Sequence, residues 1–228
     1  QFMASVRHEL RTPLASVLGS LGLLAEGVAG ELSERGKALL DIARNNVARL
    51  VRLIGDILDV DDIQSGRLKL DLQMVNLAAL VERAIDDNRP LALAAGVQLV
   101  LHNDSGRVSV HGDAARLVQA LNHLLSNALK FSPRGASVEV GVARRDTGIR
   151  VTVTDQGPGI PDAFRDRLFQ PFSQAESTDS GSRSGAGLGL SIAKAIIQQH
   201  SGSIGHEPQP GSGARFYFEL PERPDSPA

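Results

Sequence analysis

A helical repeat of apolar residues over the first sixty positions most constrains the fold. The first set of apolar side chains, separated by three or four residues, comprises Val6, Leu10, Leu14, Val17, Leu21, Leu24 and Val28. The second set comprises Leu39, Ala43, Val47, Leu50, Leu53, Ile54, Ile57 and Leu58. Such spacing is typical of amphipathic helices. The break at residues 27–30, and Ser33 as a cap for the second helix, predict a helical hairpin that ends near Gly66.

The apolar face of this hairpin is too broad for a single partner helix. Two helices alone bury only a thin core, whereas two paired hairpins form a four-helix bundle that covers the face. We therefore expect a homodimer through this segment. The alternative is that the hairpin packs against the rest of the same chain.

From about residue 68 the pattern becomes a mixture of strands and helices. Their order lacks a strict strand–helix–strand rhythm, so the fold class is α+β, with a two-layer α/β sandwich whose helices cover one face of a mixed sheet. The expected domains are residues 1–66, 67–221 and a proline-rich tail or linker at 222–228. Strands are predicted at 97–101, 108–110, 137–143, 149–155 and 214–220, and helices at 77–95, 113–131 and 188–200.

Composition narrows the class of protein. The net charge of −2 argues against non-specific nucleic-acid binding, and the lack of cysteine excludes disulfide and thiolate chemistry. No apolar run approaches the roughly 18 residues that cross a bilayer, and no signal peptide opens the chain. Since Gln1 already lies on the helical pattern, we expect a cytoplasmic fragment of a longer protein, which is either free or membrane-anchored.

The segment SVRHELRTPL places an unusual histidine on the first helix. It is not the zinc-binding HExxH pattern, because Thr12 stands where the second histidine would be. At about 100° per residue, His8 points roughly 160° away from the apolar stripe, and Thr12 lies one turn further along the same outward face. A histidine on such a face is usually an ordinary surface residue. Pro13 kinks the helix beside it, which indicates a local demand other than stability.

Three glycine-rich segments mark a candidate site: DQGPGI at 155–160, GAGLGL at 185–190 and GSG at 211–213. None matches a Rossmann fingerprint or a P-loop. A glycine run that opens a helix still offers free N–H groups and the helix dipole to a phosphate, although each segment also reads as a tight turn. The polar stretch 173–185 between the first two is expected to be a lid over a ligand.

Upstream, LNHLLSNALKFSP at 121–133 reads as a helix whose leucines belong to the core. Asn127 and Lys130 are three residues apart, so both can face one cleft. An amide oxygen suits Mg²⁺ and an ammonium group suits phosphate.

The order of HELRTP, NALKF, DQGPGI, LFQPF, GAGLGL and GSG resembles the transmitter region of the sensor histidine kinases of two-component systems, over nearly the whole chain. That family joins a dimerising helical hairpin to an ATP-binding sandwich of the GHKL type. The resemblance implies ATP and Mg²⁺ as cofactors, autophosphorylation of a histidine, and transfer to an aspartate of a response-regulator receiver domain, separate or fused. Some members also dephosphorylate the receiver.

The resemblance also implies a role for each matching residue of the hairpin. His8 is the phosphoacceptor, attacking as neutral imidazole through one ring nitrogen. Glu9 takes the proton from the other nitrogen and orients the ring. Thr12 resembles the polar residue with which members that have phosphatase activity orient the attacking water.

For the nucleotide, the resemblance makes Asn127 the Mg²⁺ ligand, Lys130 a phosphate contact and Asp155 the residue that recognises adenine. Phe169 and Phe172, in LFQPF, would anchor the near end of the lid, although core packing explains either one equally well. Close backbone approach to the base is assigned to Gly157 and Gly159, and the phosphate cradle and lid hinge to Gly185, Gly187 and Gly189.

The sequence departs from the family at His123, Ala186 and Ala214, where many members have asparagine, threonine or serine, and threonine. These departures bear on the catalytic rate. Two other classes stay open: a dimeric scaffold that has lost turnover, and a relative of the gyrase, mismatch-repair and heat-shock ATPases. The retained site residues argue against the first, and HELRTP on a hairpin has no place in the second.

Overall fold

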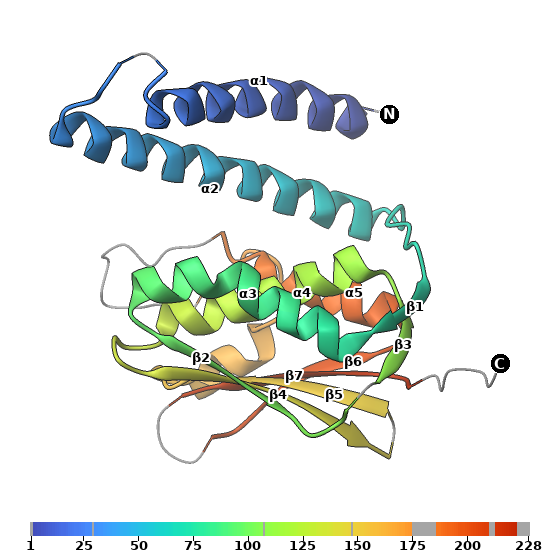
Figure 1. Ribbon diagram of the computed structural model, residues 1–228. Helices are drawn as coiled ribbons and strands as arrows, with labels where there is room; N and C mark the ends of the chain where they lie inside the picture. The colour runs from blue at the N-terminus through green and yellow to red at the C-terminus, as the bar shows by residue number, and fades with distance from the viewer. Residues whose placement is uncertain are drawn as a thin grey trace. The chain divides into compact units, whose positions relative to one another are not determined.

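The computed structural model describes residues 2–28, 30–106, 108–146, 148–174, 186–209 and 213–222, with side chains from residue 12 onward (Figure 1). The chain divides into two compact units, residues 1–68 and 69–228, which are described separately below. Within the described ranges, no helix has both the length and the apolar character of a membrane span.

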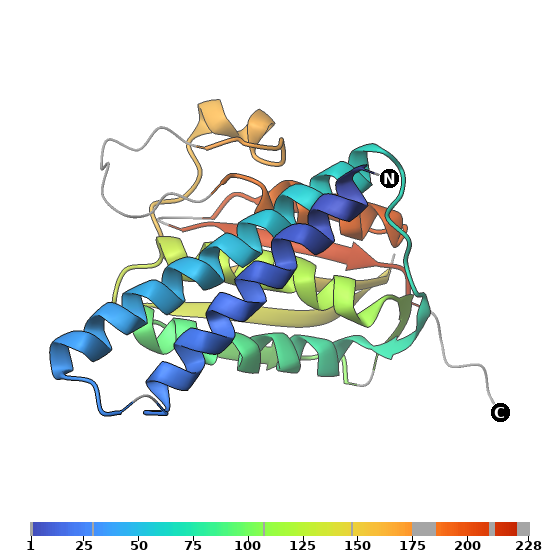
Figure 2. The same cartoon turned by 90° about the horizontal axis from the view of Figure 1, so that it is seen from above.

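The first unit is the predicted helical hairpin. Helices α1 (Phe2–Ala25) and α2 (Glu34–Gln64) lie side by side along their length (Figure 2). Ser33 caps α2 as predicted, because its Oγ accepts a hydrogen bond from the backbone N–H of Gly36 at 3.1 Å. Pro13 lies inside α1.

Large apolar side chains remain exposed along the hairpin. Leu39 is 62% exposed, and several others on both helices are more than a third exposed. An apolar surface of this extent on two helices is typical of a face that another molecule covers. The exposed members are Val17, Leu23, Leu24, Val28, Leu39, Ile42, Leu50 and Ile57.

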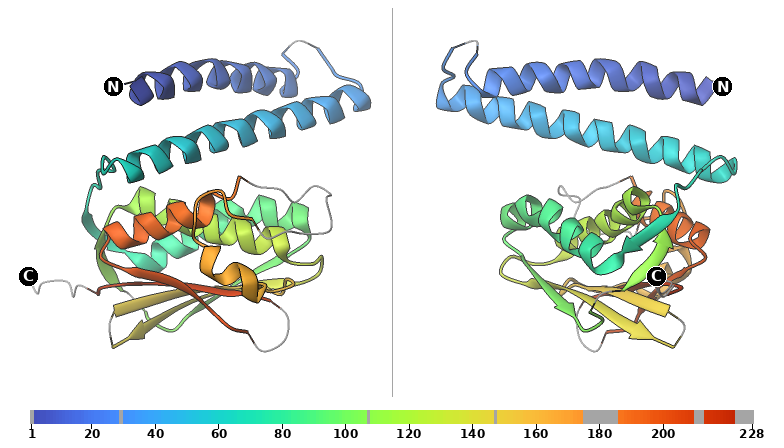
Figure 3. Two further views of the ribbon diagram at one scale, coloured as in Figure 1. Left: turned by 180° about the vertical axis from the view of Figure 1, so that it is seen from behind. Right: turned by 45° about the vertical axis from the view of Figure 1, so that its right-hand side comes forward.

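The second unit is a two-layer α/β sandwich. Its five-stranded sheet has the order β2-β4-β5-β7-β6; the β2–β4 pair is parallel and the other pairs are antiparallel. Helices α3, α4 and α5 cover one face of this sheet (Figure 3). A separate antiparallel pair joins β1 to β3. The elements are β1 (Gln73–Asn76), α3 (Leu77–Ala95), β2 (Gln98–Asn103), β3 (Ser109–Gly112), α4 (Ala114–Phe131), β4 (Ser137–Arg145), β5 (Gly148–Thr154), η1 (Asp162–Arg167), α5 (Gly189–Gln199), β6 (Ser203–Glu207) and β7 (Arg215–Leu220).

The core lies between the sheet and the helices. Alternate residues of the central strands point toward the helices, and the apolar stripe of α4 meets them. The residues between them point to the opposite face and are less buried, as expected for a sheet covered on one side only. Fully buried members of this core include Leu117, Leu121, Leu124, Leu125, Val138, Val140, Ile149, Val151, Val153, Phe216 and Phe218.

The predicted α+β class, the mixed sheet and its covering helices are confirmed. Three elements were not predicted: the short strand β1, the 3-10 turn η1 and the edge strand β6. The sequence of β6, SIGHE, has a glycine at its centre and little alternation, so only its pairing with β7 makes it a strand.

Candidate functional site

The carboxylate of Asp155 is the best-defined polar group of the candidate site. It directly follows β5 and is only 5% exposed. Its Oδ1 accepts hydrogen bonds from the backbone N–H groups of Gly157 at 2.8 Å and Ala214 at 3.1 Å. Within the described parts of the chain, both hydrogen bonds of the carboxylate go to Oδ1, which leaves Oδ2 for a ligand.

Glycines make this arrangement possible. A Cβ built on Gly213, whose φ is 117°, would lie 2.2 Å from the backbone oxygen of Asp155. A Cβ on Gly157 would lie 2.8 Å from the backbone oxygen of Phe131, the last residue of α4. The DQGPGI turn is therefore packed backbone to backbone against both the start of β7 and the end of α4. Gly159, with a φ of 81°, faces the oxygen of Gly213.

Burial raises the pKa of the Asp155 carboxyl above its ordinary value, and the two N–H donors act in the opposite direction. Among the described residues, the hydrogen bonds of this carboxylate come from backbone N–H groups and not from a cation, and burying a carboxylate in this way is costly for folding alone. Such a group is typical of a site that binds a ligand.

Asn127 and Lys130 lie on the last turns of α4, both partly exposed, so they reach the same end of the helix that contacts Gly157. The ammonium of Lys130 also lies 4.7 Å from the centre of the Phe131 ring. The structure thus places the predicted amide and cation on the element that adjoins the Asp155 turn.

The glycine segment before α5 is described from residue 186, so Gly185 lies outside the described residues. Gly187 has a φ of 70°, and a Cβ there would lie 2.7 Å from the backbone oxygen of Ser173. Helix α5 begins at Gly189, and its N-cap Leu188 makes no side-chain capping bond. Because this N-cap residue provides no side-chain cap for α5, the backbone N–H groups of its first turn suit an anion.

The two phenylalanines of LFQPF differ in their surroundings. Phe169 packs edge-on against Phe216 of β7, with ring centres 6.5 Å apart, and the Lys194 ammonium of α5 lies 5.8 Å from its ring. Phe172 is 65% exposed and has a φ of 63°, which is rare for a residue other than glycine. Their proposed anchoring of the segment 175–185 concerns residues outside the described part of the chain.

The backbone of α1 includes His8 and Glu9, but their side chains lie outside the described residues. Thr12 is exposed on this helix. The hairpin and the sandwich belong to separate units, so each holds its own part of the candidate site.

The roles of three residues, Gly213, Ala214 and His123, were not predicted from the sequence. The N–H of Ala214 donates to Asp155, and Gly213, which has no Cβ, allows the close approach; they lie 59 and 58 positions after Asp155, in and beside a GSG segment that the sequence predicts only as a tight turn. His123, noted only as a departure from the family, lies against the start of α5: a Cβ on Gly189 would be 2.8 Å from its Nδ1.

These groups fit a magnesium nucleotide. An acceptor oxygen matches an amino group of a base, an amide oxygen matches Mg²⁺, and an ammonium and a helix start match phosphate. Within the described residues, no cluster of three or more histidine, aspartate or glutamate side chains is arranged to hold a metal without a ligand. A metal carried by nucleotide phosphates and one amide is consistent with that donor set.

Two family models match the chain. The His Kinase A (phospho-acceptor) domain matches residues 1–66, and the histidine kinase-, DNA gyrase B- and HSP90-like ATPase matches residues 112–224. The chain is 34% identical over 225 residues to the sensor protein DivL of Caulobacter vibrioides. The aligned region covers 97% of this chain and 28% of DivL. The chain spans between 15% and 36% of the length of eight curated relatives that it matches, DivL among them.

Solved structures agree. The chain is similar to full-length ShkA in complex with AMPPNP, with a TM-score of 0.78 and 30% identity over 99% of this chain and 46% of that one. It is also similar to the mycobacterial sensor histidine kinase MprB, with a TM-score of 0.59 and 30% identity over 67% of this chain and all of that one. The chain therefore belongs to the sensor histidine kinases of two-component systems, of which it is a transmitter region with a phospho-acceptor and an ATP-binding domain.

Proposed function

We propose that the protein phosphorylates itself on His8 with ATP and then transfers the phosphoryl group to an aspartate of a response-regulator receiver domain. Family membership supports this activity. The single observation that carries the nucleotide part is the buried Asp155 carboxylate, whose Oδ1 is held by two backbone N–H groups while Oδ2 stays available. Residues 1–66 would supply the phosphoacceptor and residues 67–221 the nucleotide site, with 222–228 as a tail.

In this proposal Asp155 accepts a hydrogen bond from the amino group of adenine. Guanine presents a carbonyl oxygen at that position, so the carboxylate selects ATP. Asn127 would hold Mg²⁺, which neutralises charge on the phosphates, while Lys130 contacts a phosphate oxygen. Gly157 and Gly159 admit the base, and the phosphates lie at the glycine segment Gly185, Gly187 and Gly189, whose last member opens α5.

The chemical step is an in-line transfer. One ring nitrogen of His8 forms a bond to the γ-phosphorus as the bond to the bridging oxygen breaks, and ADP leaves. Glu9 accepts the proton from the other ring nitrogen, which lets the ring donate electrons without building up charge. The phosphoryl group then passes from His8 to a receiver aspartate. An outward-facing histidine suits this task, because it must meet two different domains in turn.

Thr12 lies one turn after His8 and is exposed. We assign it to the orientation of the water that hydrolyses a phosphorylated receiver docked on the same face. The proposal thus includes a phosphatase activity as a second use of the hairpin.

The hairpin is proposed to form a homodimer. Its exposed apolar side chains, among them Leu39 at 62% and Ile42 at 58%, support a four-helix bundle with a second copy. The receiver partner is either a separate protein or a further domain of the same polypeptide. The site of action is proposed to be the cytoplasm, where ATP is abundant. Proteins there rarely contain disulfide bonds, which agrees with a chain that has no cysteine.

Labelling with γ-labelled ATP, combined with nucleotide binding, tests the proposal. His8→Ala should abolish labelling and leave the ATP dissociation constant unchanged, because the two tasks lie in separate units. Asn127→Ala should abolish Mg²⁺-dependent labelling together with tight ATP binding. Equal loss of ATP affinity in both variants would contradict the assignment. A parent chain with neither label nor turnover would be a scaffold, and one that releases only free phosphate would be an ATPase of the gyrase type.

A further inference from the structure

A buried histidine at the end of α5 has no part in the proposed reaction. His200 is 5% exposed; its Nδ1 lies 2.8 Å from the backbone oxygen of Ile196, and its Nε2 accepts from the backbone N–H of Asp113 at 2.9 Å. A carbonyl only accepts and an amide N–H only donates. The ring therefore carries its proton on Nδ1 and a lone pair on Nε2, and both nitrogens are used.

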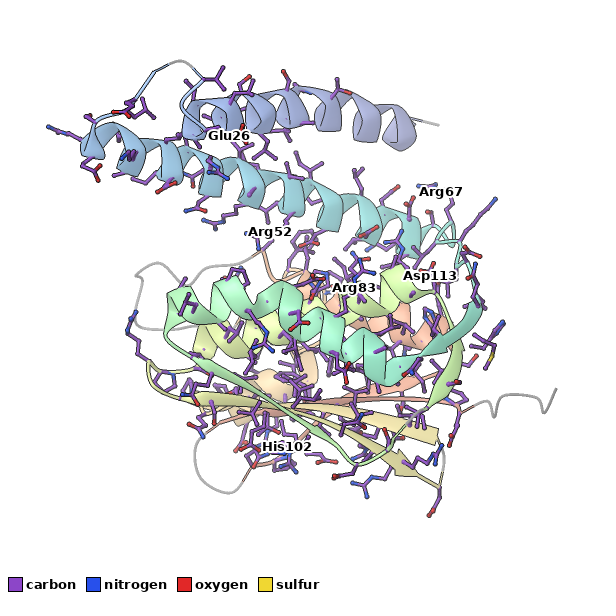
Figure 4. The ribbon with its side chains drawn as sticks, in the orientation of Figure 1. Glu26, Arg52, Arg67, Arg83, His102 and Asp113 are labelled. Carbon is purple, nitrogen blue, oxygen red and sulfur yellow. The ribbon has the colours of Figure 1, made fainter. Side chains whose placement is uncertain are left out.

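Asp113 joins His200 to α4 and to the segment that precedes β1. It is the N-cap of α4, and its Oδ1 accepts from the N–H of Arg116 at 3.1 Å (Figure 4 labels Asp113). Its Oδ2 accepts from the N–H of Asp71 at 3.0 Å. A Cβ on Gly112 would lie 3.1 Å from the imidazole, so the glycine gives the ring its access. The end of α5 is thus fixed to the start of α4.

A second contact fixes the other end of α5. His123, in the middle of α4, lies against Gly189, the first residue of α5. The two helices therefore run antiparallel. Along α4 the contact points are ten residues apart (113 to 123), and along α5 eleven (189 to 200), which correspond to about 15 and 16 Å of helix. Asn127 lies one turn beyond His123, so the axial position of α5 sets how Gly187 and Gly189 face Asn127.

We infer that His200 is a positioning residue for the phosphates of the nucleotide: it holds α5 at the axial position where Gly187, Gly189 and Asn127 reach the same ligand. The inference rests on the proposed ATP site. A packed helix moves as a rigid body, so a shift at His200 is carried to Gly189. Misplacement of reacting groups by about 1 Å is enough to cost orders of magnitude in rate.

The contacts of Asp155 do not depend on α5. Its two hydrogen-bond donors come from its own turn and from the segment before β7. A change at His200 should therefore disturb phosphate binding and spare base binding. Adenosine, which lacks phosphates, is the probe that separates the two.

Two substitutions test the Nε2 contact. In His200→Gln, the side-chain oxygen stands near the place of Nε2 and can accept from Asp113. In His200→Asn, the shorter amide can only replace the Nδ1 donor toward Ile196, and the buried N–H of Asp113 loses its acceptor. The dissociation constants of Mg·ATP and of adenosine are measured for the full chain and for its two variants. The thermal midpoint of each protein without ligand is measured alongside.

The expected result is that His200→Asn weakens ATP binding about tenfold relative to adenosine, while His200→Gln keeps the parent ratio within about twofold. A merely structural histidine would lower the thermal midpoint and change both affinities in parallel, which would overturn the inference. An unchanged ratio in both variants would overturn it as well. A parent chain that binds adenosine but not ATP, or neither, would refute the proposed function itself and this inference with it.

Discussion

Asp155→Asn should reverse the base preference of the site rather than merely weaken it. Oδ1 is held by the N–H groups of Gly157 and Ala214. The oxygen of an asparagine must take that place, because the opposite orientation would point its NH₂ group at two other donors. The NH₂ group therefore replaces Oδ2 and becomes a donor toward the ligand, which opposes the amino group of adenine and matches the carbonyl of guanine.

The magnitude follows from the burial of the group. A buried polar group left without a partner costs about 1–3 kcal/mol, and about 1.4 kcal/mol is a factor of ten, so ATP should bind roughly 5- to 140-fold more weakly. GTP should bind more tightly than it does to the parent. The fold should persist, since both backbone hydrogen bonds survive.

Competition of ATP and GTP for a fluorescent nucleotide measures both changes. Asp104→Asn is the matched control, because it removes the same charge from an exposed position outside the site. An unchanged ratio of the ATP and GTP affinities, whether or not both fall, would refute the orientation argument.

Three further predictions follow from the geometry. Gly213→Ala should reduce ATP affinity more than about tenfold, because its Cβ would lie 2.2 Å from the backbone oxygen of Asp155. Gly135→Ala, at a glycine that also has a positive φ (82°) but no atom within 4 Å of the added Cβ, should leave ATP binding intact. Calorimetric titration compares the two variants, and equal effects would contradict the account. Burial and the Asp59 carboxylate raise the pKa of Asp56 to about 6, so the free energy of unfolding should fall as pH rises from about 4 to about 6. Asp56→Asn should therefore stabilise the chain at pH 7.5 by at most about 3 kcal/mol and should not stabilise it at pH 4. Melting curves measured at several pH values test this. Thr12→Ala should slow receiver dephosphorylation measured with ADP present while labelling continues; an equal fall in labelling would remove Thr12 from the hydrolytic step.

Much of the fold was predictable, because its elements carry their own local signals. The helix predicted at 77–95 coincides with α3, where Asn76 caps the start and Gly96 ends it with a positive φ. The apolar alternation of β4 and β5 marked the central strands. By contrast, β6 carries a central glycine and is a strand only because β7 lies beside it, which no local pattern reveals.

The site residues were predictable only in kind. A carboxylate after a strand, followed by glycines, indicated a binding turn at Asp155. One of the two donors that engage Oδ1 is the N–H of Ala214, 59 residues later. The His200–Asp113 bond spans 87 residues and left no periodic signal. Contacts between distant segments are properties of the folded chain, and a single sequence does not display them.

The central claim is that ATP phosphorylates His8. The most direct measurement is to incubate the full chain with γ-labelled ATP and Mg²⁺, then locate the label by mass spectrometry and by its stability in acid and base. Phosphohistidine is acid-labile and base-stable, and the account predicts one such label on the peptide that contains His8, absent from His8→Ala. Label on another residue, or label that persists in His8→Ala, would contradict the account.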